Sequence, residues 1–131
     1  MGRSLTLVAA GGAVAIAAGV ALVSFAPPAS AQAALVAQGQ KLYQTQCGIC
    51  HAPAQNKIGP MHKGIVNRAV ATVPGFRYSA ALKKLGGTWT PARLDTWLAN
   101  PQAMAKGSTM VLRVNDPNQR KAIIAYLATL K

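Results

Sequence analysis

The sequence predicts a small all-α domain in which helices alternate with long loops. Three stretches carry apolar residues at helical spacing, and two of them follow clear helix start signals. No stretch alternates apolar and polar residues as a half-buried strand does, and the segments between the helices are irregular and rich in Gly and Pro. At 131 residues, the chain has room for one small domain and a separate N-terminal segment.

The N-terminal segment has the composition of a secretory signal peptide. It combines a basic start at Arg3, an apolar run from Leu5 to Ala26 and the small-residue pattern Ala29-Ser30-Ala31. We expect cleavage after Ala31, or as a second choice after Ala33, which makes residues 1–31 the signal peptide and residues 32–131 the folded domain. The alternative is a retained membrane anchor, because an apolar run of about 20 residues can span a bilayer. Either way, we expect the folded domain in the periplasm.

The first helix is predicted from about Ala33 to Gln46, where Leu35, Leu42 and Tyr43 recur near helical intervals. Gly39 lowers the helix propensity of this stretch. It therefore suggests a close crossing at which another helix leaves no room for a side chain. Simple tolerance of a glycine is the alternative.

The motif Cys47-Gly48-Ile49-Cys50-His51 follows this helix, and the rest of the chain is organised around it. Its spacing is that of covalent c-type haem attachment. Two thiols on a short turn can each form a thioether with one haem vinyl group, and the next imidazole is then held at the iron as an axial ligand. We therefore predict one haem c, attached through Cys47 and Cys50, with His51 on the iron.

Three other interpretations of the motif are weaker. A thioredoxin-like redox pair requires alternating strands and helices around it. A zinc site requires two further ligands, and His62 is the only other histidine in the chain. A disulfide between two cysteines this close would stabilise the fold little, because it closes a very short loop.

The middle of the chain is predicted to wrap the bound group. The segment from Ala52 to Val73 has no sustained period and is expected to be a loop. Ser79 to Leu85 is a short helix candidate that stops at Gly86-Gly87. The second main helix begins at Thr90-Pro91, with Thr as N-cap and Pro at the first position, and it ends at Asn100-Pro101.

The C-terminal part contains the third main helix. The segment from Gln102 to Val114 is again irregular. Asp116-Pro117 then repeats the start signal, with Gln119 at the capping-box position. The apolar stripe of this helix consists of Ile123, Tyr126, Leu127 and Leu130.

The second axial ligand has four candidates: Met61, His62, Met104 and Met110. Spacing alone does not choose among them, because an extended chain reaches either face of a haem from all four positions. Met61 and His62 follow the motif closely and are expected on the His51 side. Met110 is slightly favoured over Met104, because the extended, turn-capable stretch before it could lay a thioether against a flat ring.

Six segments follow one known pattern in order and near its spacing. They are GQKLYQTQCGICH at 39–51, the stretch from Ile58-Gly59-Pro60 to Arg68, and the segments 74–78, 87–91, 97–101 and 107–110. In these segments the chain resembles the class I cytochromes c, the family of the mitochondrial carrier and its soluble bacterial relatives, over essentially all of residues 32–131. The resemblance implies the cytochrome c fold, with three main helices, short helices and long loops around one covalently bound haem.

The resemblance also implies roles for individual residues. Met110 takes the position of the second iron ligand. The Pro60 carbonyl is expected to accept the Nδ1 hydrogen of His51. Arg68, Tyr78 and Trp89 are expected to hydrogen-bond or neutralise a buried haem propionate, which would otherwise be a costly unpaired charge. Gly39 and Tyr43 are expected to meet Ile123 and Tyr126 where the first and last helices cross.

Three positions depart from the family pattern. Lys106 stands where a proline usually precedes the glycine of the Met loop, so a more mobile loop and a weaker Met bond are expected. His62 stands where an apolar residue usually packs, and we expect it to point to solvent and titrate near neutral pH, or to compete for the iron in a misfolded or alkaline form. Trp97 replaces a common tyrosine, which leaves a hydrogen bond to the Met110 sulfur open.

The charge balance favours an acidic partner. Residues 32–131 contain 13 Lys and Arg against two Asp, a formal charge of +11 before any cofactor. So one-sided a balance steers association with something acidic. Acidic-faced redox proteins, such as an oxidase, reductase or dehydrogenase, fit best, and weak association with anionic lipid at a membrane surface is the alternative. Nucleic acid is excluded as a partner, because an exported protein rarely meets it and no binding motif is present.

The function expected from these observations is a monomeric one-electron carrier with a His/Met-ligated haem c. An enzyme is not expected, because Asp95 and Asp116 are the only carboxylate side chains and form no acid-base constellation. One alternative is a dedicated cytochrome c subunit of a periplasmic dehydrogenase. A haem enzyme or gas binder with an open distal face is the less favoured one.

Overall fold

The computed structural model describes residue 2 and residues 28–131. In this part of the chain there are five α-helices, one short π-helix and no strand. In order, they are α1 (Ala29–Leu42), the π-helix η1 (Tyr43–Cys47), α2 (Ala80–Leu85), α3 (Pro91–Ala99), α4 (Pro101–Met104) and α5 (Pro117–Leu127). The predicted all-α class is confirmed, with one isolated bridge between Ala69 and Thr88.

The predicted signal peptide lies almost wholly outside the described residues. Its last four residues, 28–31, are described, and α1 begins among them at Ala29. The helix therefore starts earlier than the predicted Ala33, and cleavage after Ala31 would leave it beginning at Gln32. None of the described helices is both long and apolar enough to cross a membrane.

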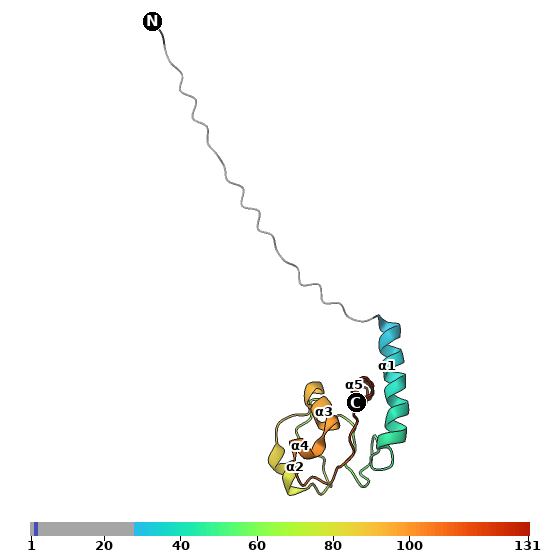
Figure 1. Cartoon of the computed structure of the whole chain (residues 1–131), viewed down its shortest axis with the longest axis vertical. Coiled ribbons are helices and arrows are strands. Elements are labelled where there is room, and N and C mark those ends of the chain that lie inside the picture. Colours follow the sequence, from blue (N-terminus) through green and yellow to red (C-terminus); the bar gives the residue numbers. More distant parts are fainter. Residues whose placement is uncertain (1, 3–27) are drawn as a thin grey trace.

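The crossing of α1 and α5 is the most extensive contact between helices in the described part of the chain (Figure 1). A Cβ on Gly39 would fall on the backbone carbonyl of Ala122 and within 3.0 Å of the Tyr126 Cβ. The expected close crossing at Gly39 is confirmed, with Ala122 rather than Ile123 as the residue beneath it. One turn further along, the rings of Tyr43 and Tyr126 lie 5.2 Å apart. Figure 1 shows α5 between α1 on one side and α2, α3 and α4 on the other.

The first helix changes its winding just before the motif. From Tyr43 to Cys47 it becomes a π-helix, in which the Gly48 amide donates to the Tyr43 carbonyl at 2.8 Å. The Thr45 hydroxyl lies 3.1 Å from the carbonyls of both Lys41 and Leu42, inside this widened turn. Such single-turn widenings are common at functional sites, and here it leads directly into the cysteine motif.

The predicted starts of α2 and α3 are confirmed by their caps. The Ser79 hydroxyl accepts from the Leu82 amide, and the Thr90 hydroxyl accepts from the Arg93 amide, both at 3.2 Å. Each cap satisfies an amide that has no partner within its own helix. An ion pair of 2.7 Å between Arg120 and Asp95 then joins α5 to α3.

Two details of the helix prediction were wrong. Residues 102–104 are not irregular, because Pro101 begins α4 and the Asn100 side chain caps it by accepting from the Ala103 amide. Gln119 forms no capping box. Its side-chain oxygen accepts from the amide of Gln46 instead, while the Asp116 carboxylate caps α5 by accepting from the Asn118 amide.

Candidate haem site

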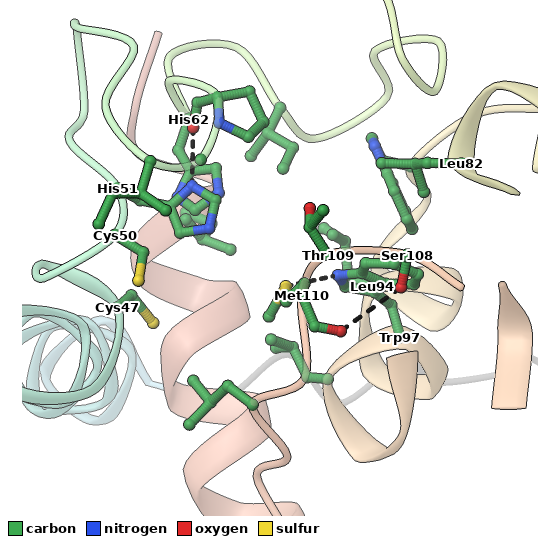
Figure 2. A pocket seen from close by; sticks show the side chains of 18 of the residues that line it. Cys47, Cys50, His51, His62, Leu82, Leu94, Trp97, Ser108, Thr109 and Met110 are labelled. Atoms are coloured by element: carbon green, nitrogen blue, oxygen red, sulfur yellow. Dashed lines mark hydrogen bonds between the residues drawn. The ribbon is translucent and has the colours of Figure 1, made fainter. Parts of the chain in front are cut away.

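A cavity of about 370 Å³ lies between the cysteine motif and the segment around Met110. Figure 2 shows Cys47, Cys50 and His51 on one side of it, and Thr109 and Met110 on the other. Its walls are mainly apolar, and α3 and α5 contribute Leu94, Leu98, Ile123 and Leu127 to them. Residues from both ends of the domain therefore meet around one apolar chamber.

His51 is held in one orientation by the loop that follows it. Its Nδ1 lies 2.7 Å from the Pro60 carbonyl oxygen, the hydrogen bond that was expected. Since a carbonyl only accepts, Nδ1 carries the hydrogen and Nε2 keeps its lone pair. A Cβ on Gly59 would collide with the imidazole ring, so this position lets the backbone approach the ring closely. Burial lowers the pKa of His51, which favours the neutral imidazole that a metal requires.

His62 does not point to solvent, so that expectation was wrong. Its ring stacks on the His51 ring with centroids 4.1 Å apart and planes 21° from parallel. Its Nδ1 lies 3.1 Å from the Tyr43 hydroxyl oxygen, which gives the buried ring a polar partner. Burial lowers the pKa of His62 well below its usual value. The histidine thus fills the place of an apolar residue as a neutral, packed ring.

The two cysteines differ in exposure. Cys47 is buried at the end of the π-helix, and burial raises the pKa of its thiol to about 11. Cys50 is exposed, and both residues carry free thiols that line the cavity. Two unpaired thiols facing one apolar chamber suit thioether attachment of a flat ring.

Met110 lies across the cavity from His51, and its sulfur has a hydrogen-bond donor. The Trp97 indole Nε1 donates to the Met110 Sδ at 3.2 Å (Figure 2). The hydrogen bond that the sequence left open is therefore present, supplied by an indole instead of a phenol. Trp97 is only 6% exposed and packs against Trp89 at 5.3 Å, so its donor is fixed in place.

The other ligand candidates are placed differently. Met61 and Met104 do not line this cavity, and Met104 borders a separate pocket with Lys84 and Lys106. His62 lines the cavity, but from the His51 side. Among the four candidates, Met110 alone lies opposite His51.

Arg68, Tyr78 and Trp89 also line the cavity. The Arg68 guanidinium donates to the carbonyl oxygens of Lys63 at 2.7 Å and Met61 at 3.1 Å. The Tyr78 hydroxyl accepts from the Val73 amide at 3.2 Å. Arg68 and Tyr78 are thus anchored to loop backbone while part of each side chain remains at the cavity wall, whereas the Trp89 ring is held by packing against Trp97.

Sequence reasoning missed Gln102. Its side-chain amide contacts Ser108 and Met110, and its oxygen accepts from the Gly107 amide. The only sequence signal was the Asn100-Pro101 pair, which starts a new helix as well as ending the previous one.

Comparison with known proteins decides the family. Residues 36–131 match the family model described as "Cytochrome c". The chain belongs to the cytochrome c family. The resemblance to class I cytochromes c is thereby confirmed, and with it an electron-carrier family whose members bind haem c covalently and are not enzymes.

Individual relatives are similar over the whole haem domain. Cytochrome c2 of Rhodomicrobium vannielii is 38% identical over 96 residues, which cover 70% of this chain and 76% of that protein. The c-type cytochrome cy of Rhodobacter capsulatus is 40% identical over 94 residues, 70% of this chain but only 47% of that protein. The solved structure of cytochrome cH from Methylobacterium extorquens has a TM-score of 0.69 at 40% identity, covering 72% of this chain and 97% of that one.

The residues present fit haem c. The cavity has a mainly apolar wall, with two free thiols at CxxCH spacing and a neutral imidazole on one side and a thioether on the opposite side. Nitrogen and thioether sulfur are the axial donors found in cytochromes c. No other group accounts for all of these features at once.

Proposed function

We propose that this cytochrome c is a periplasmic one-electron carrier whose iron is held by His51 and Met110. The observation that carries the proposal is the placement of a neutral imidazole and an indole-held thioether on opposite sides of one apolar cavity. Haem iron supplies the chemistry, alternating between Fe(III) and Fe(II). An axial thioether in an apolar shell favours the ferrous state.

The chain's own residues keep this site rigid. His51 is fixed by the Pro60 carbonyl and by the stacked His62 ring, and Met110 is fixed by Trp97. Because both side chains that would hold the iron are fixed, the surroundings would need little rearrangement when the charge of the site changes. Low rearrangement is what an electron carrier requires.

We assign Arg68, Tyr78 and Trp89 to the acidic substituents of the haem. Arg68 has a cationic head and Tyr78 and Trp89 have polar hydrogens at the cavity wall. Together they would offset the cost of a carboxylate in an apolar chamber. The bonds of Arg68 to loop carbonyls and of Tyr78 to the Val73 amide hold these two side chains ready for that contact.

Partner contact would occur at the open edge of the cavity. Ile49, Ile58 and Val111 line the cavity, and each is more than 70% exposed, so an apolar rim is accessible from outside. The +11 charge of residues 32–131 would steer this rim towards an acidic-faced oxidase, reductase or dehydrogenase. The signal-peptide composition of residues 1–31 supports a periplasmic location.

Carbon monoxide binding tests the proposal against an open-face haem protein. A ferrous iron with both axial positions occupied should show no spectral change in CO-saturated buffer, and a redox titration should fit a single one-electron wave. The variant Met110→Ala opens one position and should bind CO. Rapid CO binding by the wild type would overturn the carrier assignment in favour of a gas binder or enzyme.

A further inference from the structure

We propose that Gln102 is a positioning residue that locks the backbone of residues 105–110 and thereby holds Met110 at the iron. This inference rests on the proposed function, because it takes Met110 as the second ligand. It concerns the backbone of the Met110 loop, whereas Trp97 acts on the sulfur.

The Gln102 side chain connects three residues of this loop. Its Nε2 lies 2.8 Å from the Ser108 carbonyl, 2.9 Å from the Ser108 hydroxyl and 2.9 Å from the Met110 carbonyl. Its Oε1 accepts from the Gly107 amide at 3.2 Å. An amide group has two donor hydrogens and one oxygen with two lone pairs, so these contacts use both hydrogens and one lone pair within one loop.

The base of this connection is rigid. Gln102 is the second residue of α4, between the buried ring of Pro101 and the turn that closes at Ala105. The Ala105 amide donates to the Pro101 carbonyl at 2.9 Å, and the Asn100 side chain caps the same turn. Because this turn is fixed, the Gln102 side chain that starts from it can hold the bonded loop backbone in one place.

The loop itself offers few other restraints. Residues 105–110 contain Gly107 and no proline, so the intrinsic preferences of these residues do not restrict the loop to one backbone conformation. Apart from the Gln102 contacts, Ser108 donates to the Ala105 carbonyl from its amide at 3.0 Å. Because the Met110 side chain starts from this backbone, releasing the loop would allow the sulfur to leave the iron more often.

Imidazole competition measures how often Met110 leaves. Added imidazole binds ferric iron only when the position is vacant, so its apparent affinity scales with the open fraction. Gln102→Leu removes every contact of the side-chain amide and keeps its approximate size. We expect imidazole to bind at least about tenfold more tightly to this variant, because a tenfold change corresponds to the usual net contribution of only one or two hydrogen bonds. Amide exchange at Gly107 in the haem-loaded protein should accelerate in parallel.

Gln119→Leu is the matched control. It makes the same chemical change at another partly buried glutamine, whose bond to Gln46 joins η1 to α5 away from the loop. Its imidazole affinity and its Gly107 exchange should match those of the wild type. Equal tightening in both glutamine variants would mean general loosening of the fold and would overturn the inference.

Further variants separate the inference from the proposed function. Gln102→Glu places carboxylate oxygens against the Ser108 and Met110 carbonyls, so imidazole should bind at least as tightly as to Gln102→Leu; this variant serves if the leucine one does not fold. If Met110→Ala binds imidazole no better than the wild type, Met110 is not the ligand and the proposed function fails. If Met110→Ala binds it far better but both Gln102 variants match the wild type, only the role of Gln102 is wrong.

Discussion

At the scale of single residues, Trp97 acts directly on the proposed iron ligand. Its indole nitrogen donates a hydrogen bond to the Met110 sulfur at 3.2 Å, and this bond would draw on the electron density that the sulfur could give to iron. Ferric iron benefits more from that density than ferrous iron does. The contact therefore favours the reduced state.

Trp97→Phe should lower the reduction potential. The ring remains but the donor is lost, and the usual net worth of one hydrogen bond corresponds to about 20–60 mV for a one-electron couple. Potentiometric titration of both proteins at one pH measures the change. An unchanged or higher potential would show that the contact does not tune the sulfur.

Tyr43 is expected to make the stability of the fold decrease as the pH rises in the alkaline range. Burial raises its pKa far above the ordinary value of 10.0. The folded state thus holds a proton that the unfolded chain releases at about pH 10. The stability that comes from this difference is fully present below that pH and is lost as the pH rises towards the folded-state pKa.

Tyr43→Phe should remove this loss. Between about pH 8 and about pH 11, the free energy of unfolding of the wild type should fall by about 1.4 kcal/mol more than that of the variant. Losing the contact with His62 shifts the variant's curve by a constant amount and leaves the comparison of slopes intact. Denaturant titrations at the two pH values decide, and parallel curves would rule out a protonated, buried Tyr43.

The positions of His62 and Trp97 show where residue-level prediction stopped. Both side chains depend on a partner distant in sequence: the Tyr43 hydroxyl and His51 ring for His62, and the Met110 sulfur for Trp97. An exposed histidine was the simpler expectation, because no residue close to His62 in the sequence is an evident hydrogen-bond partner for a buried imidazole. The His51–Pro60 bond could be predicted because a family pattern specified both members.

At the scale of helices, the α1–α5 crossing depends on Gly39. A glycine at this position lowers the helix propensity of α1, but it lets the α5 backbone at Ala122 approach the α1 backbone without an intervening side chain. This crossing places Tyr43 and Cys47 beside the cavity, so loosening it would disturb the haem site as well as the packing.

Gly39→Ala should destabilise the protein by about 3 kcal/mol, the upper end of the usual cost of overpacking, because the added methyl group collides with backbone that cannot yield easily. Chemical unfolding of the haem-loaded protein measures the loss. Gln38→Ala, one position away on the exposed face of α1, is the control and should change stability by less than about 0.5 kcal/mol. If the crossing were loose, the alanine at position 39 would instead stabilise the helix.

Helix boundaries were predictable where a local cap marks them. Thr90 and Asp116 bond to amides two or three residues away, so the sequence carries the whole signal. The π-helical turn before Cys47 and the Gln46–Gln119 bond carry no such signal. They arise from how α1 meets α5, which becomes visible only in three dimensions.

At the scale of the whole molecule, the family could be predicted from the order of several motifs. CxxCH alone indicates a haem, whereas six segments in register indicate a particular fold around it, and the family match over residues 36–131 confirms this. The geometry of the Met110 loop could not be predicted in the same way. Lys106 in place of the usual proline leads to the expectation of a more mobile loop, which stays a prediction, and the Gln102 contacts with this loop start from a helix that the sequence did not reveal.

The charge of the molecule predicts salt-dependent kinetics with opposite signs for opposite partners. With +11 on residues 32–131, oxidation of the ferrous protein by anionic ferricyanide should slow several-fold between about 10 mM and 150 mM salt, as screening shortens from about 30 Å to 8 Å. Oxidation by a cationic cobalt(III) complex should accelerate over the same range. Stopped-flow rates insensitive to salt with both oxidants would show that the basic excess does not steer association.

The central claim is that Met110 closes the haem site opposite His51. The near-infrared sulfur-to-iron charge-transfer band of the ferric protein tests it most directly, because only a thioether bound to iron produces this band. We predict that the wild type shows the band and that Met110→Ala, with haem still attached through Cys47 and Cys50, lacks it. A wild type without the band, or a Met110→Ala variant that keeps it, would contradict the assignment.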